Sequence, residues 1–118
     1  ILPGNTDNPA AHGLAWTHYA SLLDSGVKIY EYTPGFVHAK VFVSDDLEAV
    51  VGTINLDYRS LYHHFECAVY MRQTACIAQI EEDFRKTLAQ CAEITPQSKI
   101  KTSRKLLGWL LKGIAPLM

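Results

Sequence analysis

Two short apolar segments joined by a polar turn constrain the fold of this chain most strongly. Residues 36–43 and 49–54 are rich in Val, Phe and Ile, and the run Ser44-Asp45-Asp46-Leu47-Glu48 separates them. β-Branched and aromatic residues favour strands, and Ser and Asp favour turns. The pattern therefore predicts two strands that can form a hairpin.

The remaining segments predict helices and further strands around this pair. Asp7-Asn8-Pro9 is a helix start, because Asp and Asn cap a helix and Pro suits its first turn. Helical or strand patterns place a helix over residues 9–25, a strand over 27–32, a polar loop over 55–63, a strand over 65–71 and a helix over 75–92. This order predicts an α/β (mixed α+β) fold, with a mixed sheet of at least four strands flanked by helices.

Composition narrows the class of protein. Of the 118 residues, 48% are hydrophobic and only 19% are charged, which excludes a disordered chain. Three cysteines without CxxC spacing make neither a disulfide framework nor a zinc site. No stretch reaches the ~18 apolar residues that span a bilayer. Because the chain starts at Ile1, we expect it to be a piece of a longer protein.

Charge divides the chain into two parts, residues 1–98 and residues 99–118. The second part holds five basic residues and no acidic one, whereas the first carries a net charge of −6. Leu and Trp residues stand beside these cations, as in a helix that lies in the headgroup zone of an anionic membrane. The alternative is a helix packed against another part of the parent protein.

A cluster of polar residues marks a candidate site on the hairpin. His38 and Lys40 are two residues apart on one predicted strand, and Thr53 and Asn55 are two apart at the end of the next, so each pair shares a face. Gly52 lets a ligand or a backbone approach closely. An imidazole can attack phosphorus or move a proton, and the other groups can hold phosphate oxygens. The cluster therefore predicts phosphodiester transfer.

The spacing of these residues resembles a known motif. His38-x-Lys40, four residues, Asp45, six residues, and Gly52-Thr53-x-Asn55 match the HKD motif of the phospholipase D superfamily. The surrounding segments GVKIYEYTPGFVHAK and VGTINLDYRSLYHHFE are similar to the C-terminal HKD region of bacterial cardiolipin synthases.

The resemblance implies a role for each residue. His38 would be nucleophile or general acid/base, with the second role favoured for a C-terminal motif. Lys40 and Asn55 would bind the substrate phosphate, Thr53 would add a hydroxyl, and Asp45 would support structure more than chemistry. Glu66 would hydrogen-bond the second nitrogen of the His38 imidazole, although pairing with Arg59 is an alternative. No cofactor and no metal are implied.

The resemblance also implies that this chain holds half of an active site. Family enzymes place two HKD motifs across an interface, and the other four histidines here have no Lys two residues later. The expected function is phosphatidyl transfer between phosphatidylglycerol molecules through a phosphohistidine. The expected ligand is an anionic phospholipid, phosphatidylglycerol, at the surface of the bacterial cell membrane. The expected protein partner is the N-terminal HKD half of the parent protein or a second copy of this chain.

The sequence leaves two other functions possible. One is a homodimeric phospholipase D-like phosphodiesterase, either a lipid hydrolase or a nuclease. The other is a non-catalytic membrane-interaction module, against which an intact motif argues. The negative charge of residues 1–98 disfavours a nucleic-acid backbone, so no nucleic acid is expected as a partner.

Overall fold

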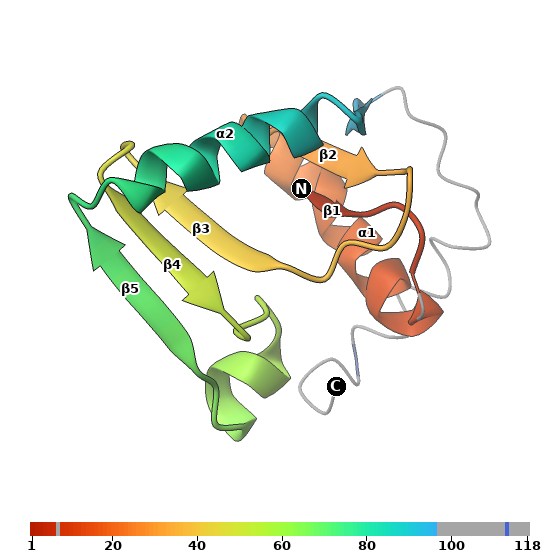
Figure 1. The fold of residues 1–118 in the computed structure, drawn as a ribbon. Helices are drawn as coiled ribbons and strands as arrows, with labels where there is room; N and C mark the ends of the chain where they lie inside the picture. Colours follow the sequence, from red (N-terminus) through yellow and green to blue (C-terminus); the bar gives the residue numbers. More distant parts are fainter. Residues whose placement is uncertain (7, 97–112, 114–118) are drawn as a thin grey trace.

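The computed structural model describes residues 1–6, 8–96 and 113 (Figure 1). Its elements are two small β-sheets, two α-helices and one short π-helix. The predicted basic tail, residues 99–118, lies outside the described residues except for Gly113. Within the described part of the chain, no helix has the length and apolarity needed to cross a membrane.

The first sheet has the strand order β1-β2-β6. β1 (Leu2–Pro3) pairs in parallel with β2 (Ile29–Tyr32), and β2 pairs antiparallel with β6 (Cys91–Ile94). After β1 the chain stays beside β2, because Gly4 N donates to Tyr32 O at 2.8 Å. β1, near the start of the chain, and β6, near the end of the described part, therefore both pair with β2, the strand that precedes the predicted hairpin.

The second sheet is that hairpin with one further strand. β3 (Lys40–Ser44), β4 (Glu48–Gly52) and β5 (Ala68–Arg72) form an antiparallel meander in sequence order. Lys40 pairs with Gly52, and Gly52 pairs with Ala68. At this end of the sheet β3 begins, β4 ends and β5 begins, so the segments attached to them leave from one edge.

Two α-helices pack against these sheets. α1 (Pro9–Asp24) begins at Asn8, whose side-chain oxygen accepts from Ala11 N at 3.1 Å, and it is followed by Gly26 with a φ of 83°. Asn8 and Gly26 thus act as the start and stop signals that their residue types predict. α2 (Cys76–Leu88) runs from the end of β5 past β2 toward β6 (Figure 1). The most buried apolar residues come from both helices and both sheets, namely Tyr19, Ile29, Ala49 and Ile77.

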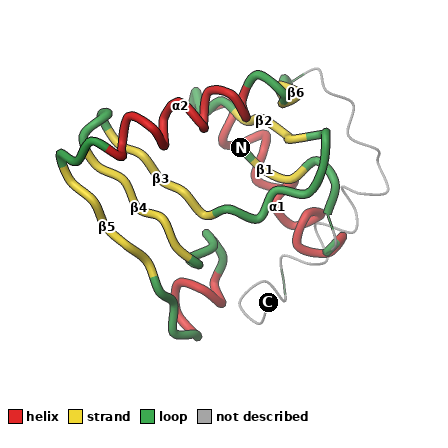
Figure 2. Tube along the Cα trace, in the orientation of Figure 1, coloured by secondary structure: helices red, strands yellow, loops and turns green. Residues whose placement is uncertain are grey.

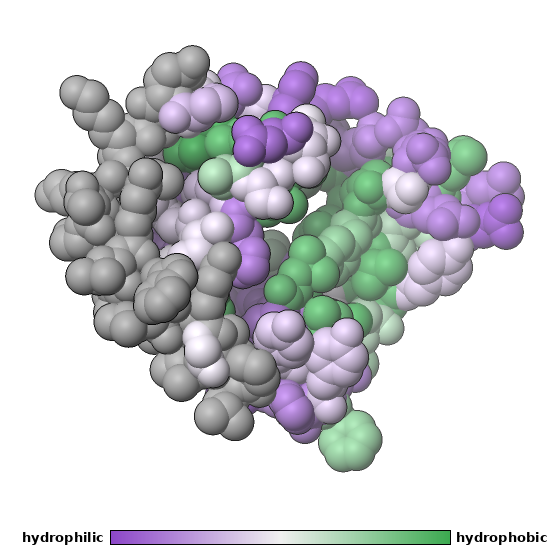
Figure 3. Space-filling view, turned by 180° about the vertical axis from the view of Figure 1, so that it is seen from behind, coloured by the Kyte–Doolittle hydropathy of each residue, from purple (hydrophilic) through white to green (hydrophobic). Residues whose placement is uncertain are grey.

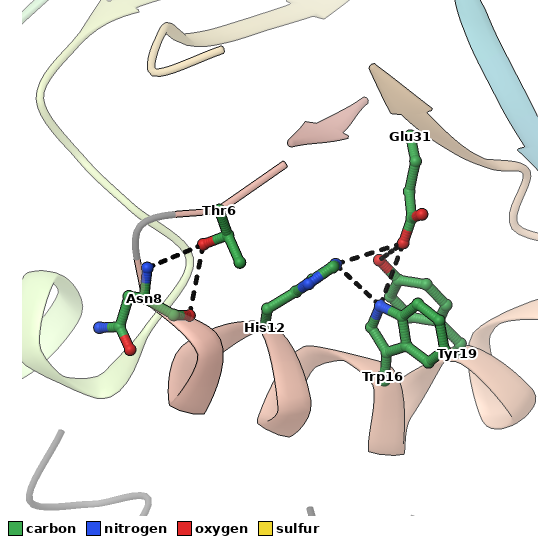
Figure 4. A network of polar contacts seen from close by, with 6 residues as sticks. All are labelled: Thr6, Asn8, His12, Trp16, Tyr19 and Glu31. Atoms are coloured by element: carbon green, nitrogen blue, oxygen red, sulfur yellow. Dashed lines mark hydrogen bonds and ion pairs between the residues drawn. The ribbon is translucent and has the colours of Figure 1, made fainter. Parts of the chain in front are cut away.

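A polar network fastens α1 to β2 (Figure 4). One carboxylate oxygen of Glu31, on β2, accepts from Trp16 Nε1 at 3.0 Å and from Tyr19 OH at 3.1 Å, and His12 Nε2 lies 3.3 Å from it. Trp16 Nε1 also lies 2.8 Å from His12 Nε2. A mostly buried carboxylate needs such partners, since burial without hydrogen bonds is costly.

The mixed α/β class and the flanking helices are confirmed, but the strand arrangement differs from the prediction (Figure 2). The strands form two three-stranded sheets, whereas the sequence predicted one mixed sheet of at least four strands. Periodicity identifies strands but carries no information about which strands become neighbours. The two sheets therefore could not be separated from the sequence.

Several segments also differ in their bounds, among them the strand predicted over residues 65–71, which begins at Ala68. The second helix ends at Leu88, not near residue 92, because Cys91–Ile94 pairs with β2 as strand β6. The strand predicted from residue 36 begins at Lys40, and its last residue is Ser44. The predicted loop 55–63 contains the π-helix η1 (Arg59–His63).

Candidate functional site

The candidate site lies at the open end of the β3–β4 hairpin. Lys40 begins β3 and pairs with Gly52, the last residue of β4. His38 precedes this pair, and Thr53 and Asn55 follow it. Because antiparallel strands run past each other, both segments leave the hairpin at the same end. The segments that carry His38, Lys40, Thr53 and Asn55 thus lie at one end of the hairpin.

His38 lies in the segment that connects β2 to β3. Its side chain is exposed, and its ring stacks on Phe36 with centroids 5.7 Å apart and planes 29° apart. Lys40 Nζ donates to the carbonyl oxygen of His38 at 2.7 Å, which folds the ammonium group back toward the histidine. The Phe36 ring therefore supports the imidazole, and the Lys40 ammonium is held at the backbone of the same residue.

Thr53 connects the end of β4 to the start of β5. Its hydroxyl donates to Glu66 Oε2 and accepts from Cys67 N at 3.1 Å, and its own backbone N donates to Cys67 O at 3.0 Å. Hydrogen bonds from Thr53 and then from Ser60 lower the pKa of Glu66. Glu66 is therefore held as an ionised carboxylate beside the predicted phosphate-binding residues.

The structure brings Glu66 to Thr53 rather than to the imidazole. In the described residues, Glu66 forms no hydrogen bond with His38 or with Arg59. Arg59 Nε instead donates to His64 Nε2. The hydrogen bond from His38 to Glu66 stays a prediction for the assembled site.

Asn55 lies between β4 and η1, and its amide is exposed. The segment behind it is fixed by Asp57, whose Oδ1 accepts from Ser60 N at 2.7 Å. Ser60 is buried, with 7% of its surface exposed. η1 therefore holds a defined position next to Asn55.

Asp45 stands apart from the other motif residues. It lies in the turn at the far end of the hairpin, where Leu47 N donates to Ser44 O at 3.0 Å and Ser44 Oγ donates to Asp45 Oδ2 at 3.1 Å. Asp45 and Asp46 have φ values of 53° and 57°. The structure thus places Asp45 in a tight turn, a hairpin's length from His38.

The close packing of β4 against β5 at this end of the sheet requires glycine at residue 52. A Cβ at residue 52 would meet Cys67 O, and it would lie 2.5 Å from Ala68 Cβ and 2.6 Å from Ala68 Cα. Real Cβ atoms do not approach other atoms so closely. A side chain here would push β5 away from β4 and would separate Thr53 from Glu66.

Sequence reasoning missed two residues that shape the site. Phe36 stacks on His38, and the signal for it was an aromatic residue two positions earlier on a predicted strand. Ser60 bonds to Asp57 and Glu66, and no local pattern marks it. Among the described residues, no three metal-ligating side chains gather.

The arrangement suits the chemistry of phosphate esters. One imidazole, one ammonium and one amide lie on segments that leave the same end of the hairpin. Such groups can transfer a proton or attack phosphorus and can stabilise charge on phosphate oxygens. The motif contains one histidine, His38, so a reaction that uses two histidines needs the second from another motif.

Comparison with known proteins places these residues in a family context. Residues 1–88 match the family model described as cardiolipin synthase, phospholipase D-like domain. No solved structure matches the chain.

Several relatives match over the whole chain. A Streptococcus mutans protein described only as uncharacterised is 58% identical, and the chain covers 26% of its length. A Clostridium perfringens cardiolipin synthase is 38% identical with 25% of its length covered, and cardiolipin synthase 2 of Bacillus anthracis is 32% identical with 23% covered. The chain thus spans about a quarter of the length of the curated relatives it matches.

Proposed function

The chain belongs to the phospholipase D-like domain family of the cardiolipin synthases, and on that premise we propose that it supplies one half of a phosphatidyltransferase active site. The observation that carries the proposal is the gathering of His38, Lys40, Thr53 and Asn55 at one end of the β3–β4 hairpin. Phosphodiester transfer needs no redox or carbonyl cofactor, and these residue types supply the groups that it does need.

The proposed reaction has two displacements at phosphorus. A histidine nitrogen attacks the phosphorus of phosphatidylglycerol, the bond to glycerol breaks, and the opposite imidazole gives the leaving oxygen its proton. A hydroxyl of a second phosphatidylglycerol then loses its proton to that imidazole and attacks the phosphohistidine. The phosphorus–nitrogen bond breaks, cardiolipin forms, and both histidines return to their starting states.

Each residue of this chain has a part in that scheme. His38 acts as the general acid and base, in keeping with a C-terminal motif. Lys40 and Asn55 hold non-bridging phosphate oxygens. The Thr53 hydroxyl donates its one proton to Glu66 in the chain alone, so it reaches a phosphate oxygen only if it turns from Glu66 to the substrate. Charged donors form the stronger hydrogen bonds to phosphate, so Lys40 is expected to contribute most to binding.

The second histidine comes from another HKD motif. We propose that it is supplied by the N-terminal HKD half of the parent protein, or by a second copy of this chain. The substrate is an anionic phospholipid, so the assembled enzyme works at a membrane surface of the bacterial cell. The basic tail, residues 99–118, would strengthen that attachment through its five cations.

The test is cardiolipin formation from phosphatidylglycerol vesicles by the full-length parent protein. His38→Ala should lower the rate about 1000-fold, which is the order of magnitude that an acid–base catalyst contributes. His18→Ala, which changes an exposed histidine of α1 outside the motif, should leave the rate unchanged. Equal rates for the two variants would contradict the proposal.

A homodimeric phospholipase D-like phosphodiesterase, either a lipid hydrolase or a nuclease, is the second candidate, because the same residues can transfer the phosphoryl group to water. The two candidates differ in the acceptor, which is a lipid hydroxyl in one and water in the other. If phosphatidic acid accumulates instead of cardiolipin, the hydrolase is the correct function. If neither product forms while the intact site still binds the vesicles, the chain is a membrane-interaction module.

A further inference from the structure

The segment that follows the phosphate-binding residues exposes an unusual amount of apolar surface. Leu56, Tyr58, Leu61, Tyr62 and Phe65 are exposed to 78%, 50%, 50%, 74% and 106%. We call these five residues the apolar rim. Single exposed apolar residues are ordinary, but five large ones within ten positions mark an interaction surface.

The rim is displayed by an ordered segment. Asp57 accepts a hydrogen bond from Ser60 N, and Ser60 is the buried residue of η1, so this helix is anchored to the protein through Ser60. On the other side, the rings of Tyr58 and Tyr62 lie together, with centroids 6.0 Å apart. The fold therefore turns the small polar residue inward and the large apolar residues outward, the reverse of an ordinary surface helix.

The rim lies next to the candidate site in the sequence at both of its ends. Leu56 directly follows Asn55, and Phe65 directly precedes Glu66, whose carboxylate bonds to Thr53. In a phospholipid, a short glycerol link separates the phosphate from the acyl chains. A phosphate held at Lys40 and Asn55 therefore places its acyl chains against neighbouring surface, and the rim is that surface.

The contact of this segment with a bilayer depends on its apolar and aromatic residues rather than on charge. The segment carries two acidic residues, Asp57 and Glu66, which bond to Ser60 and Thr53, and one basic residue, Arg59, which is exposed and donates to His64. Tyrosines with a neighbouring cation are typical of the membrane–water interface, where the ring is apolar and the hydroxyl meets water. Apolar side chains also show over the strands of the β3–β5 sheet in Figure 3.

We propose that the apolar rim inserts into the headgroup–acyl boundary of an anionic phospholipid bilayer and so sets the candidate site at the depth of the lipid phosphates. The proposal rests on the proposed function for its choice of lipid. It gives residues 56–65 a membrane contact of their own, separate from the basic tail.

The experiment measures depth with vesicles of phosphatidylglycerol and phosphatidylcholine that carry bromine on their acyl chains. Bromine quenches only tryptophans at the acyl boundary. Tyr62→Trp adds a tryptophan on the rim, and Leu47→Trp adds one at the far end of the hairpin, where Leu47 is 50% exposed. Trp16 and Trp109 are common to both variants, so the unchanged chain gives the background.

We expect the emission added by Tyr62→Trp to be quenched at least twofold and that added by Leu47→Trp to be unchanged. Phe65→Ser should weaken vesicle binding about tenfold, because a large apolar side chain leaves the boundary. Equal quenching at both positions, binding without quenching at residue 62, or no vesicle binding would each overturn the proposal.

A protein partner at the rim is the competing outcome. If the chain forms a dimer in lipid-free buffer and Phe65→Ser dissociates it in sedimentation velocity, the rim is a subunit interface and the membrane proposal is wrong. Because quenching needs no turnover, loss of the lipid contact can be told apart from failure of the catalytic proposal, which the cardiolipin assay tests alone. Circular dichroism checks that each variant is folded.

Discussion

The hydroxyl of Thr53 donates a hydrogen bond to the carboxylate of Glu66, 13 residues later in the chain. The same hydroxyl accepts from the backbone N of Cys67 at 3.1 Å. This contact closes the loop that carries Asn55 and η1, and it fixes both ends of that loop at the edge of the β4–β5 pair. The candidate site and the apolar rim therefore depend on one threonine.

Thr53→Val should raise the pKa of Glu66 toward its usual value. The Thr53 hydrogen bond is the largest cause of the lowered pKa, and the Ser60 hydrogen bond is the next. NMR titration of the Glu66 side-chain carboxyl measures the shift, and Thr53→Ser, which keeps a hydroxyl, should leave it in place. An unchanged pKa in Thr53→Val would show that the hydrogen bond is absent in solution.

The same contact predicts a dependence of stability on pH. Because the folded state lowers the pKa of Glu66, its contribution to the free energy of unfolding is complete above the usual carboxyl pKa of about 4.3. That contribution is lost as the pH falls through the lowered pKa. Urea unfolding between pH 6 and pH 3, in steps of about half a unit, should therefore show a smaller acid loss for Thr53→Val than for the unchanged chain.

Gly52→Ala should destabilise the second sheet by about 1–3 kcal/mol, the usual cost of forcing extra atoms into a packed position. The added methyl would lie 2.5 Å from Ala68 Cβ, and most of the obstructing atoms belong to the backbone, which cannot rotate away. Gly35→Ala is the matched control, since its Cβ would only touch Tyr32 Cε1 at 3.9 Å. Equal urea midpoints for the two variants would contradict the close approach.

Much of the fold followed from local patterns. The capping residue Asn8, the stop at Gly26 and the turn at Asp45-Asp46 each have a local physical cause, and all three appear where the sequence places them. The pairing of the two predicted strands as a hairpin also followed, because the polar turn joins them directly. Local chemistry was enough wherever neighbours in sequence are neighbours in space.

The parts that could not be predicted depend on distant pairing. The predicted helix extends to residue 92, yet residues 91–94 form β6 because Cys91 pairs with Tyr32 across a large sequence separation. The choice of Thr53 as the partner of Glu66 depends likewise on how β4 meets β5. No single-segment pattern encodes such choices, since propensity is a weak prior that tertiary contacts override.

The turn of the hairpin offers a stabilising change. Asp45 and Asp46 both adopt positive φ, which suits Asn followed by Gly better than two aspartates. Asp45→Asn with Asp46→Gly should raise the free energy of unfolding by about 1 kcal/mol by relieving backbone strain. Asp46→Val, with a branched Cβ, should lower it by a similar amount in the same urea experiment.

The turn change has a second readout on α2. A hydrogen bond between Asp46 and Glu81 is the largest cause of the raised pKa of Glu81. Asp46→Gly should therefore lower the pKa of Glu81, whose carboxylate keeps Arg85 Nη2 at 2.8 Å. A Glu81 titration that does not move would show that the turn and α2 are not in contact.

Tyr19 should make the protein lose stability in alkaline solution. Its side chain is 2% exposed, and burial, followed by the charge of Glu31, raises its pKa. Above about pH 10 an unfolded tyrosine ionises while the folded one keeps its proton, so the free energy of unfolding falls as the pH rises. Tyr19→Phe should remove this fall in the free energy of unfolding between about pH 9.5 and about pH 11, a range that includes the usual tyrosine pKa of about 10.

The same variant separates the alkaline effect from the loss of a hydrogen bond. At neutral pH, Tyr19→Phe should cost about 1.5–3 kcal/mol, because the Tyr19 hydroxyl donates to the Glu31 carboxylate at 3.1 Å and that bond is charge-assisted. Tyr62→Phe, which changes a hydroxyl on a side chain that is 74% exposed, is the control and should alter neither quantity. If Tyr19→Phe is as stable as the unchanged chain at pH 7 and keeps the alkaline slope, the Glu31 network does not fasten α1 to β2.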